Sequence, residues 1–237
     1  MEIRGKVVVV TGASAGIGLA TARSFAREGA RLALVARSTD ALSKLAEELH
    51  GEGVEAIAVP ADFRDPEQIR GVIAEIERQF GRIDILINNA GQAAAGTIAD
   101  VSLDDFRQIV ELNVYGPLIA MQEVIPIMRR EGGGIIINVS SMVSKMHIPG
   151  LAAYAATKAA LNMISDTARG ELAADNIRVI TVFPRLTATD FGTHSLGRQK
   201  LHSDQRSRYS GPIDTPEHVA EIIVSAAVDE PEEQYMD

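Results

Sequence analysis

Two side chains with acid–base chemistry, Tyr154 and Lys158, stand four residues apart in the run Tyr-Ala-Ala-Thr-Lys. At that spacing two residues share one face of a helix and lie one turn apart. An unperturbed phenol has a pKa of about 10 and carries protons poorly at neutral pH, whereas a nearby ammonium group lowers that pKa. The pair is therefore a candidate for proton transfer. The same spacing is common on solvated helix faces, so the interpretation needs a nucleotide site and a partner for the phenol.

A glycine-rich segment follows the first strand-like run, residues 7–10, and is a candidate phosphate site. From Thr11 to Gly18 it reads Thr-Gly-Ala-Ser-Ala-Gly-Ile-Gly. Glycine lets the backbone turn tightly and approach a pyrophosphate, and the helix that follows directs its N–H groups and positive dipole end at the anion. We expect this segment to bind a dinucleotide through Gly12, Ser14, Ala15, Gly16, Ile17 and Gly18.

The end of the second strand-like run bears on which dinucleotide binds. An NAD site usually has an acidic residue there, to hold the ribose hydroxyls. This chain has Ala36, followed by Arg37 and Ser38. A guanidinium group can hold a 2′-phosphate through paired N–H donors. We therefore predict NADP(H), with NAD(H) and a solvated loop position for Arg37 as the alternatives; Ala15 adds no second basic residue to the glycine loop.

Two further strand ends carry candidate cofactor residues. Asp62 and Phe63 follow the third strand-like run, where Asp62 is placed to meet an adenine edge. Asn89, Ala90 and Gly91 follow the fourth, where small residues let the backbone pass close to a ligand and amides can tie neighbouring loops together. Each group alone is also compatible with ordinary turn chemistry.

Hydrophobic patterning along the chain alternates between strand-like and helical segments. Short β-branched runs predict buried parallel strands at residues 7–10, 31–36, 56–59, 83–87, 135–139 and 177–182, with an edge strand starting at 233. Helices are expected at residues 17–27, 41–49, 103–130 and 152–174, and after the Asp-Pro and Thr-Pro pairs at 65–66 and 215–216. This alternation predicts right-handed βαβ units and a parallel sheet that is covered on both faces.

Composition limits the class of protein. The 237 residues are 46% hydrophobic, which is enough for one sizeable core, so we expect a single domain over residues 1–237. No segment approaches the roughly 20 apolar residues of a membrane span, and no signal segment opens the chain. The absence of cysteine excludes disulfides and fits the cytoplasm, and the formal net charge of −9 argues against nucleic acid and anionic membranes as partners.

These motifs together resemble the short-chain dehydrogenase/reductase family over essentially the whole chain. The resemblance rests on the glycine loop, the Asn-Asn-Ala-Gly run, and the order and spacing of Asn113, Ser141, Tyr154 and Lys158. It implies an α/β fold with a doubly wound parallel sheet of six to seven strands in the order 3-2-1-4-5-6-7. It also implies a nicotinamide cofactor and hydride transfer between a carbonyl and an alcohol.

The resemblance also assigns roles to the catalytic candidates. Ser141, thirteen residues before Tyr154, matches the family spacing and would donate a hydrogen bond to the substrate oxygen, whereas Ser140 would face the other side. Tyr154 would be the general acid or base. Lys158 would lower the pKa of Tyr154 and hold the nicotinamide ribose, and Asn113 would anchor a water beside Lys158.

The segment from 185 to 212 lacks clear periodicity and is interpreted as a substrate lid. The family usually has Pro-Gly where this chain has Pro184 and Arg185, and often has glycine at Ser144. Arg185 either points to solvent or meets an anionic substrate group. By resemblance, Pro184, Thr187 and Thr189 would reach the nicotinamide. The lid carries an excess of basic residues, namely Arg185, Arg198, Lys200, Arg206 and Arg208 against Asp190 and Asp204.

The leading functional hypothesis is an NADP(H)-dependent ketone or aldehyde reductase, or alcohol dehydrogenase, acting on a small molecule. The alternatives are an NAD-linked dehydrogenase and a non-catalytic dinucleotide sensor on the same fold. By resemblance, the helices at 103–130 and 152–174 would form a homodimer or homotetramer interface. No metal site is expected, because the spacing of His194 and His202 matches none, and His147 is interpreted as a loop residue that could line the pocket.

Overall fold

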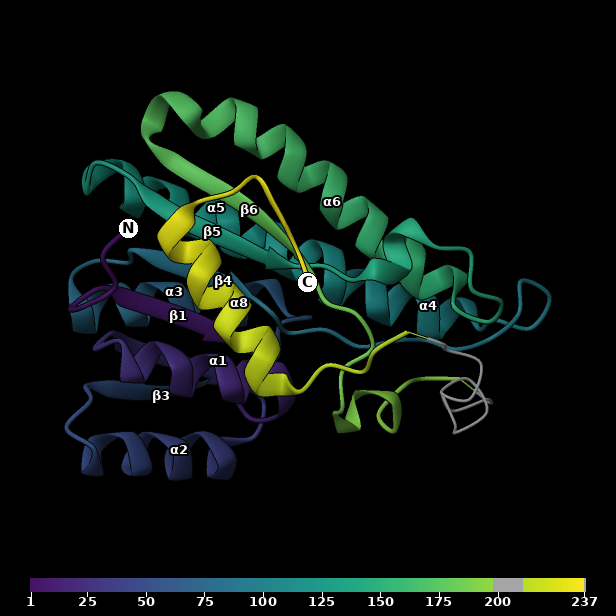
Figure 1. Cartoon of the computed structure of the whole chain (residues 1–237), viewed down its shortest axis with the longest axis horizontal. Helices are drawn as coiled ribbons and strands as arrows, with labels where there is room; N and C mark the ends of the chain where they lie inside the picture. Colours follow the sequence, from purple (N-terminus) through teal and green to yellow (C-terminus); the bar gives the residue numbers. More distant parts are fainter. Residues whose placement is uncertain (198–210, 237) are drawn as a thin grey trace.

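A computed structural model of the chain describes residues 1–197 and 211–236. Within them, seven parallel strands form one sheet in the order β3-β2-β1-β4-β5-β6-β7 (Figure 1). The strands are β1 Val7–Thr11, β2 Arg31–Ala36, β3 Ala56–Pro60, β4 Ile85–Asn88, β5 Gly134–Val139, β6 Ile177–Phe183 and β7 Glu233–Tyr235. The predicted fold class and strand order are confirmed, including the short edge strand at the end of the chain.

Helices cover both faces of the sheet. Helices α1 (Gly16–Arg27), α2 (Thr39–Gly51) and α8 (Pro216–Asp229) pack on one face. Helices α3 (Pro66–Phe80), α5 (Gly116–Arg130) and α6 (Ala152–Leu172) pack on the other. The central strands β1, β4 and β5 are buried along their whole length, which explains why their sequences are continuous apolar runs rather than alternating ones.

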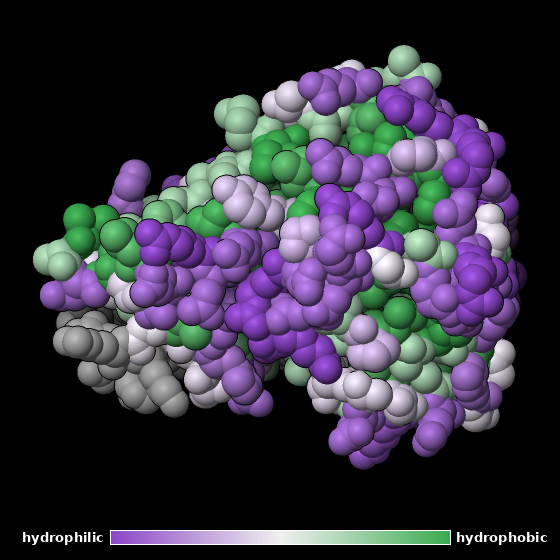
Figure 2. Space-filling view, turned by 180° about the vertical axis from the view of Figure 1, so that it is seen from behind, coloured by the Kyte–Doolittle hydropathy of each residue, from purple (hydrophilic) through white to green (hydrophobic). Residues whose placement is uncertain are grey.

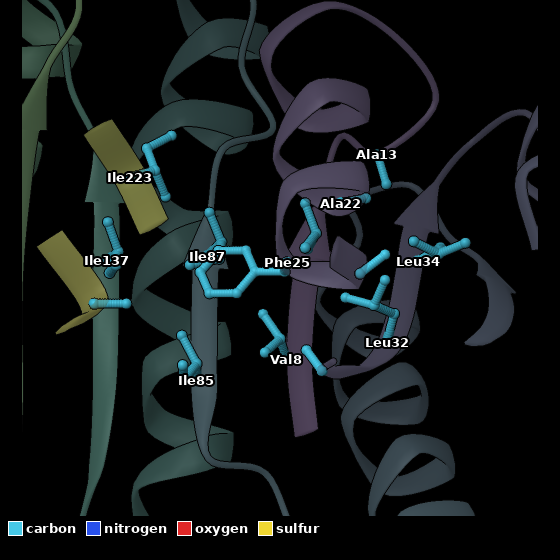
Figure 3. Close-up of a cluster of buried hydrophobic side chains, with 14 of the residues drawn as sticks. Val8, Ala13, Ala22, Phe25, Leu32, Leu34, Ile85, Ile87, Ile137 and Ile223 are labelled. Carbon is cyan, nitrogen blue, oxygen red and sulfur yellow. The ribbon is translucent and has the colours of Figure 1, made fainter. Parts of the chain in front are cut away.

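The core on the first face is built around α1. Figure 3 shows Phe25 of α1 among Val8 of β1 and Ile85 and Ile87 of β4, with Ile223 of α8 close by. Phe25 and these three strand side chains are fully buried. Alternate residues of each strand therefore serve this core, and the residues between them serve the core on the other face.

Side-chain caps fix where several helices begin. The Asp65 carboxylate accepts hydrogen bonds from the backbone N–H groups of Glu67 and Gln68, and Pro66 occupies the first turn of α3. Thr215 and Pro216 start α8 in the same way. Both starts agree with the sequence prediction, because each cap is a local pattern.

The helix predicted at 103–130 is helical over all these residues, but one turn of it is not α-helical. It divides into α4 (Leu103–Val110), a π-helical turn at Glu111–Tyr115, and α5. Pro117 lacks the N–H that would bond the carbonyl of Asn113 in an α-helix, so the regular ladder cannot run through Asn113. In addition, a side chain at Gly116 would approach the Phe63 carbonyl oxygen to 2.6 Å, so the chain comes very close to the β3–α3 loop here.

Candidate active site

Tyr154 and Lys158 lie on the first half of α6, one turn apart, as the sequence predicts. Both are buried, with 8% and 4% of their surface exposed. The Lys158 Nζ donates a hydrogen bond of 2.8 Å to the backbone carbonyl of Val139, the last residue of β5. The ammonium group is thereby fixed at the carboxyl end of β5.

Ser141 follows β5 and begins a short 3-10 turn, Met142–Lys145, towards α6. Its hydroxyl accepts a hydrogen bond of 3.2 Å from the Val143 N–H and also makes a side-chain hydrogen bond with Tyr154. Ser141, Tyr154 and Lys158 therefore converge at the end of β5. This is the arrangement expected from the spacing.

Burial controls the ionisation of this pair. It raises the pKa of Tyr154 to about 12, and the hydrogen bond from Ser141 opposes that rise only in part. It lowers the pKa of Lys158 to about 8. The expectation that Lys158 lowers the pKa of Tyr154 is wrong for this structure, because loss of hydration disfavours both charged forms and the Lys158 ammonium is bonded to Val139.

Asn113 lies in the π-helical turn and is fully buried. Its side-chain amide donates to the Gln92 carbonyl at 2.8 Å and to the Thr157 hydroxyl at 3.0 Å, and its Oδ1 accepts from the Gln92 N–H at 3.0 Å. Both amide hydrogens are therefore used by protein groups. A Cβ added at Gly91 would lie 3.3 Å from Asn113 Oδ1 and 3.6 Å from Lys158 Nζ, so these three residues meet at one point.

The two serines after β5 have different partners. The Ser140 hydroxyl donates to Asn162 Oδ1 at 2.5 Å, two turns along α6 from Tyr154. Asn162 Nδ2 donates to the Ser144 hydroxyl at 2.9 Å, and that hydroxyl donates to the Ser141 carbonyl at 2.7 Å. The Ser144 side chain, unusual at a position where glycine is common, thus ties the Ser141 turn to α6.

The glycine loop has the geometry that close contact with a phosphate requires. Gly12 and Gly16 have φ values of +71° and +53°, in the left-handed region that glycine favours. A side chain on Gly18 would overlap the Gly12 carbonyl oxygen and come within 2.5 Å of Asn89 Nδ2. Helix α1 starts at Gly16 with no side-chain cap and no acidic residue in its first turn. Its first N–H groups suit a pyrophosphate, so the residues present fit a dinucleotide.

Thr11 joins the glycine loop to the segment after β4. Its hydroxyl accepts hydrogen bonds from the N–H groups of Asn89 and Ala90, at 2.9 and 3.0 Å. Asn89 Nδ2 donates in return to the Thr11 carbonyl, also at 2.9 Å. The two motifs that the sequence analysis treated separately therefore form one surface, at the carboxyl ends of β1 and β4.

The end of β2 lacks the acidic residue of a usual NAD site, and charged side chains lie near the ends of β2 and β3. Arg64 bonds the Asp62 carboxylate through Nε and Nη2, at distances of 2.5 to 3.1 Å. Chiefly this contact, with a smaller contribution from Arg37, keeps the pKa of Asp62 below its ordinary value. Ser38 caps α2 by accepting from the Ala41 N–H, and Phe63 is buried against α5. The Asp62 carboxylate, predicted to meet adenine, is thus already held by arginine.

The segment after β6 lies between the Ser141 turn and the glycine loop. The Pro184 carbonyl accepts from the Met142 N–H at 3.0 Å. The Thr187 hydroxyl donates to the Arg185 carbonyl at 3.1 Å. A Cβ on Gly16 would lie 3.2 Å from the Thr189 methyl group, so Thr189 adjoins the phosphate cradle.

Arg185 does not point to solvent, which is one of the two alternatives expected from the sequence. It forms a bidentate ion pair with Asp214, at 3.0 and 2.9 Å, and only 20% of its side chain is exposed. It therefore does not extend into solvent, and its charge is matched by a protein carboxylate. The other lid residues considered above, Arg198, Lys200, His202, Asp204, Arg206 and Arg208, lie outside the described residues.

The family model for short chain dehydrogenases matches residues 6–199. The chain belongs to the short-chain dehydrogenase family. Like other members, it is an oxidoreductase that uses a nicotinamide dinucleotide, and the cradle between Gly12 and Gly18 supplies the site that such a cofactor needs.

Relatives of this short-chain dehydrogenase differ in cofactor. The chain is 34% identical over 229 residues to an NADP-dependent 3-hydroxy acid dehydrogenase of Schizosaccharomyces pombe, covering 95% of this chain and 88% of that protein. It superimposes on L-sorbose reductase from Gluconobacter frateurii, complexed with NADPH and L-sorbose, with a TM-score of 0.87, 31% identity, and 100% and 97% coverage. A Burkholderia phymatum family member in complex with NAD gives a TM-score of 0.91, 25% identity, and 99% and 90% coverage.

The site of this short-chain dehydrogenase also contains residues that the sequence analysis missed. The ring of Phe191 lies 5.7 Å from that of Tyr154. Gln92 Nε2 donates to the His194 carbonyl at 2.7 Å, and Leu196 forms a parallel bridge with Ala94. The segment 191–196 therefore contacts both Tyr154 and the chain after β4. No periodicity in the sequence marks it, although Pro117 could have located the π-helical turn at Asn113.

Among residues 1–197 and 211–236, no helix has the length and apolar character needed to cross a bilayer. Over the same residues, no three His, Asp or Glu side chains are grouped in a way that could hold a metal ion.

Proposed function

We propose that the protein is an NADP(H)-dependent ketone or aldehyde reductase, acting as an alcohol dehydrogenase in reverse. The observation that carries the proposal is the convergence of Ser141, Tyr154 and Lys158 at the end of β5, beside the glycine cradle. Steady-state assays with a panel of ketones, aldehydes and alcohols test it. Tight dinucleotide binding without turnover on the whole panel would favour a non-catalytic sensor instead.

In this proposal each side chain has one task during carbonyl reduction. A nicotinamide cofactor held by the cradle between Gly12 and Gly18 would supply the hydride for the carbonyl carbon. Ser141 donates a hydrogen bond to the carbonyl oxygen, where negative charge develops. Tyr154 transfers its phenolic proton to that oxygen, which completes the alcohol and leaves a phenolate beside Ser141. The Ser141 hydroxyl stabilises that phenolate by donating a hydrogen bond to it.

The pKa of Tyr154 is raised to about 12, which favours the reduction over the oxidation. Reduction uses the protonated phenol and therefore does not require Tyr154 to ionise first. At neutral pH the phenol is protonated and ready to act as an acid. In the oxidative direction it must first lose that proton, so we expect oxidation to need higher pH. After the reduction, Tyr154 must regain a proton, which we propose comes through a water anchored by the backbone carbonyl of Asn113. The side-chain amide hydrogens of Asn113 cannot anchor it, because they already bond Gln92 and Thr157.

The choice of NADP(H) rests on the charges at the ends of β2 and β3. Ala36 leaves space for a phosphate. Two cationic side chains, Arg37 and Arg64, lie near one carboxylate, Asp62, and both lower its pKa, so the local charge is net positive. A 2′-phosphate there would be attracted to Arg37. The experiment is a comparison of NADPH and NADH dissociation constants for the wild type and Arg37→Ala. We expect the variant to lose about 2 kcal/mol of NADPH affinity and little NADH affinity; NADH binding as tight as NADPH binding in the wild type would favour the NAD-linked alternative.

A neutral substrate fits the site better than an anionic one. Phe191 packs on Tyr154, and Leu196 packs against the apolar cluster that contains Tyr154. Arg185, the cation nearest the nicotinamide segment in sequence, is paired with Asp214. We propose that the chain forms a single catalytic domain with a substrate lid. Residues 185–197 and 211–214 are the part of this lid that the structure describes. The substrate would carry its carbonyl next to an apolar substituent.

We also propose a homodimer or homotetramer that uses α4, α5 and α6. Leu103 at the start of α4, Tyr115 just before α5 and Met163 on α6 are large apolar side chains with 67%, 55% and 66% of their surface exposed. Figure 2 shows apolar areas between hydrophilic ones on the face seen from behind. Sedimentation at micromolar concentration tests the assembly, and a monomer would contradict it.

A further inference from the structure

The ion pair between Arg185 and Asp214 joins residues 29 positions apart in the chain. The guanidinium Nε and Nη2 donate to Asp214 Oδ2 and Oδ1 at 3.0 and 2.9 Å, and only 5% of the Asp214 side chain is exposed. Removing one partner of such a pair leaves a poorly hydrated charge without compensation. The pair is therefore a strong constraint on the two segments that carry it.

The backbone of Asp214 holds the same segment a second time. Its carbonyl accepts from the Ala188 N–H at 2.9 Å, and its N–H donates to the Leu186 carbonyl at 2.9 Å, as a parallel bridge opposite Thr187. Side chain and backbone of one residue thus fix the chain from 185 to 188. Glycine, which often stands at position 185 in the family, would make no ion pair.

The constrained segment lies between the reacting groups and the phosphate cradle. Pro184 is bonded to Met142, next to Ser141, and Thr189 adjoins Gly16. Under the proposed function, the nicotinamide half of the cofactor binds between these two points. The conformation of residues 186–189 therefore decides whether that half is received without rearrangement.

We propose that Arg185 and Asp214 are positioning residues that hold residues 186–189 in the nicotinamide-binding conformation before the cofactor arrives. Binding of the cofactor then pays no cost for ordering the segment. The proposal rests on the proposed function only in taking the ligand to be a nicotinamide dinucleotide. It predicts a defect confined to the nicotinamide half of the ligand.

The test compares two ligands on two matched variants. Asp214→Asn removes the charge of the pair and keeps its shape. Glu55→Gln does the same to the bidentate pair of Arg31 and Glu55, at 2.7 and 2.9 Å, which lies at the opposite ends of β2 and β3. The ligands are NADPH and 2′-phospho-ADP-ribose, which lacks only the nicotinamide; the NADH and ADP-ribose pair is used if the wild type prefers NADH.

For Asp214→Asn we expect the NADPH dissociation constant to rise roughly tenfold, as it does when the competent conformation falls to about a tenth of the population. Binding of 2′-phospho-ADP-ribose should be unchanged, and Glu55→Gln should change neither constant. Arg185→Lys keeps the positive charge but loses the paired N–H donors of the guanidinium group. It should therefore raise the NADPH dissociation constant less than Arg185→Gly does. Hydrogen exchange of the Ala188 amide in the cofactor-free protein should accelerate in Asp214→Asn, while that of Ser140 should not.

Three results would overturn the inference. Equal weakening of both ligands would mean a general structural role for the pair. If Asp214→Asn changed neither the NADPH affinity nor the hydrogen exchange of the Ala188 amide, residues 186–189 would be held in place without the ion pair. If the wild type bound neither dinucleotide, the proposed function would fail with the inference, whereas the first two results leave the proposed function intact.

Discussion

The ring of Phe191 lies 5.7 Å from the ring of Tyr154, centroid to centroid, with 53° between their planes. Tilted aromatic pairs at this separation are favourable. Phe191 is 37% exposed, so one part of its ring contacts Tyr154 while another part borders solvent. A substrate whose carbonyl reaches Tyr154 would pass along this ring, and Phe191 is thus a natural determinant of substrate choice.

Replacing Phe191 with alanine should weaken the use of apolar carbonyl substrates. We expect kcat/KM for aryl or branched alkyl ketones to fall about tenfold, which corresponds to the roughly 1.4 kcal/mol of an aromatic contact. Phe191→Leu should retain most of the activity. The control is Val228→Ala on α8, another exposed apolar side chain. An equal loss on small polar ketones would argue against a role in selection.

Tyr154→Phe should remove turnover without removing the cofactor. A positioned general acid contributes roughly 10²- to 10⁴-fold, so kcat should fall by at least that range. The ring and its contact with Phe191 remain, so the NADPH dissociation constant should not change. Tyr115→Phe, at an exposed tyrosine, is the matched control. Turnover retained in Tyr154→Phe would refute the assignment of the proton donor.

The lowered pKa of Lys158, about 8, gives the reduction a defined pH dependence. Tyr154, with a pKa of about 12, stays protonated over the accessible range, so the loss of activity at high pH should report Lys158. We expect kcat/KM to be level near neutral pH and to fall above about 8. In Lys158→Arg, whose guanidinium does not titrate there, that decline should move to higher pH. An unchanged decline would assign it to another group.

The same group affects stability in a predictable direction. The unfolded chain holds the Lys158 proton up to about 10.5, and the folded protein only up to about 8. Between those values the unfolded state binds more protons, so the contribution of Lys158 to the free energy of unfolding rises with pH. Urea unfolding measures this free energy. In Lys158→Met, its increase between about pH 8 and 10.5 should be smaller than in the wild type.

The sequence predicted the fold well because its signals are local. The β-branched runs 7–10 and 135–139, the caps at Asp65 and Thr215, and the glycine loop each depend on a few adjacent residues. The convergence of Ser141 and Tyr154 followed from strand and helix ends whose positions the same patterns determine.

Contacts between distant segments could not be predicted in this way. The pairing of Arg185 with Asp214 and the packing of Phe191 on Tyr154 depend on a segment without periodicity. The direction of the Tyr154 pKa was missed for a related reason: spacing shows that Lys158 is near, and only burial shows that loss of hydration dominates. The π-helical turn at Asn113 was predictable in principle from Pro117, which removes one backbone donor.

Gly18→Ala should destabilise the protein and abolish dinucleotide binding. The new methyl group would overlap the Gly12 carbonyl oxygen and crowd Asn89 Nδ2, and the first of these is backbone that cannot rotate away. Overpacking of this kind costs about 1–3 kcal/mol or more. Gly170→Ala is the matched control, because Gly170 is an exposed position in α6 with no heavy atom within 4 Å of the added Cβ. That variant should be more stable than the wild type by about 1 kcal/mol, the helix preference of alanine over glycine. Urea unfolding and NADPH titration of both variants measure the difference, and normal binding by Gly18→Ala would mean that the cradle is not where the cofactor binds.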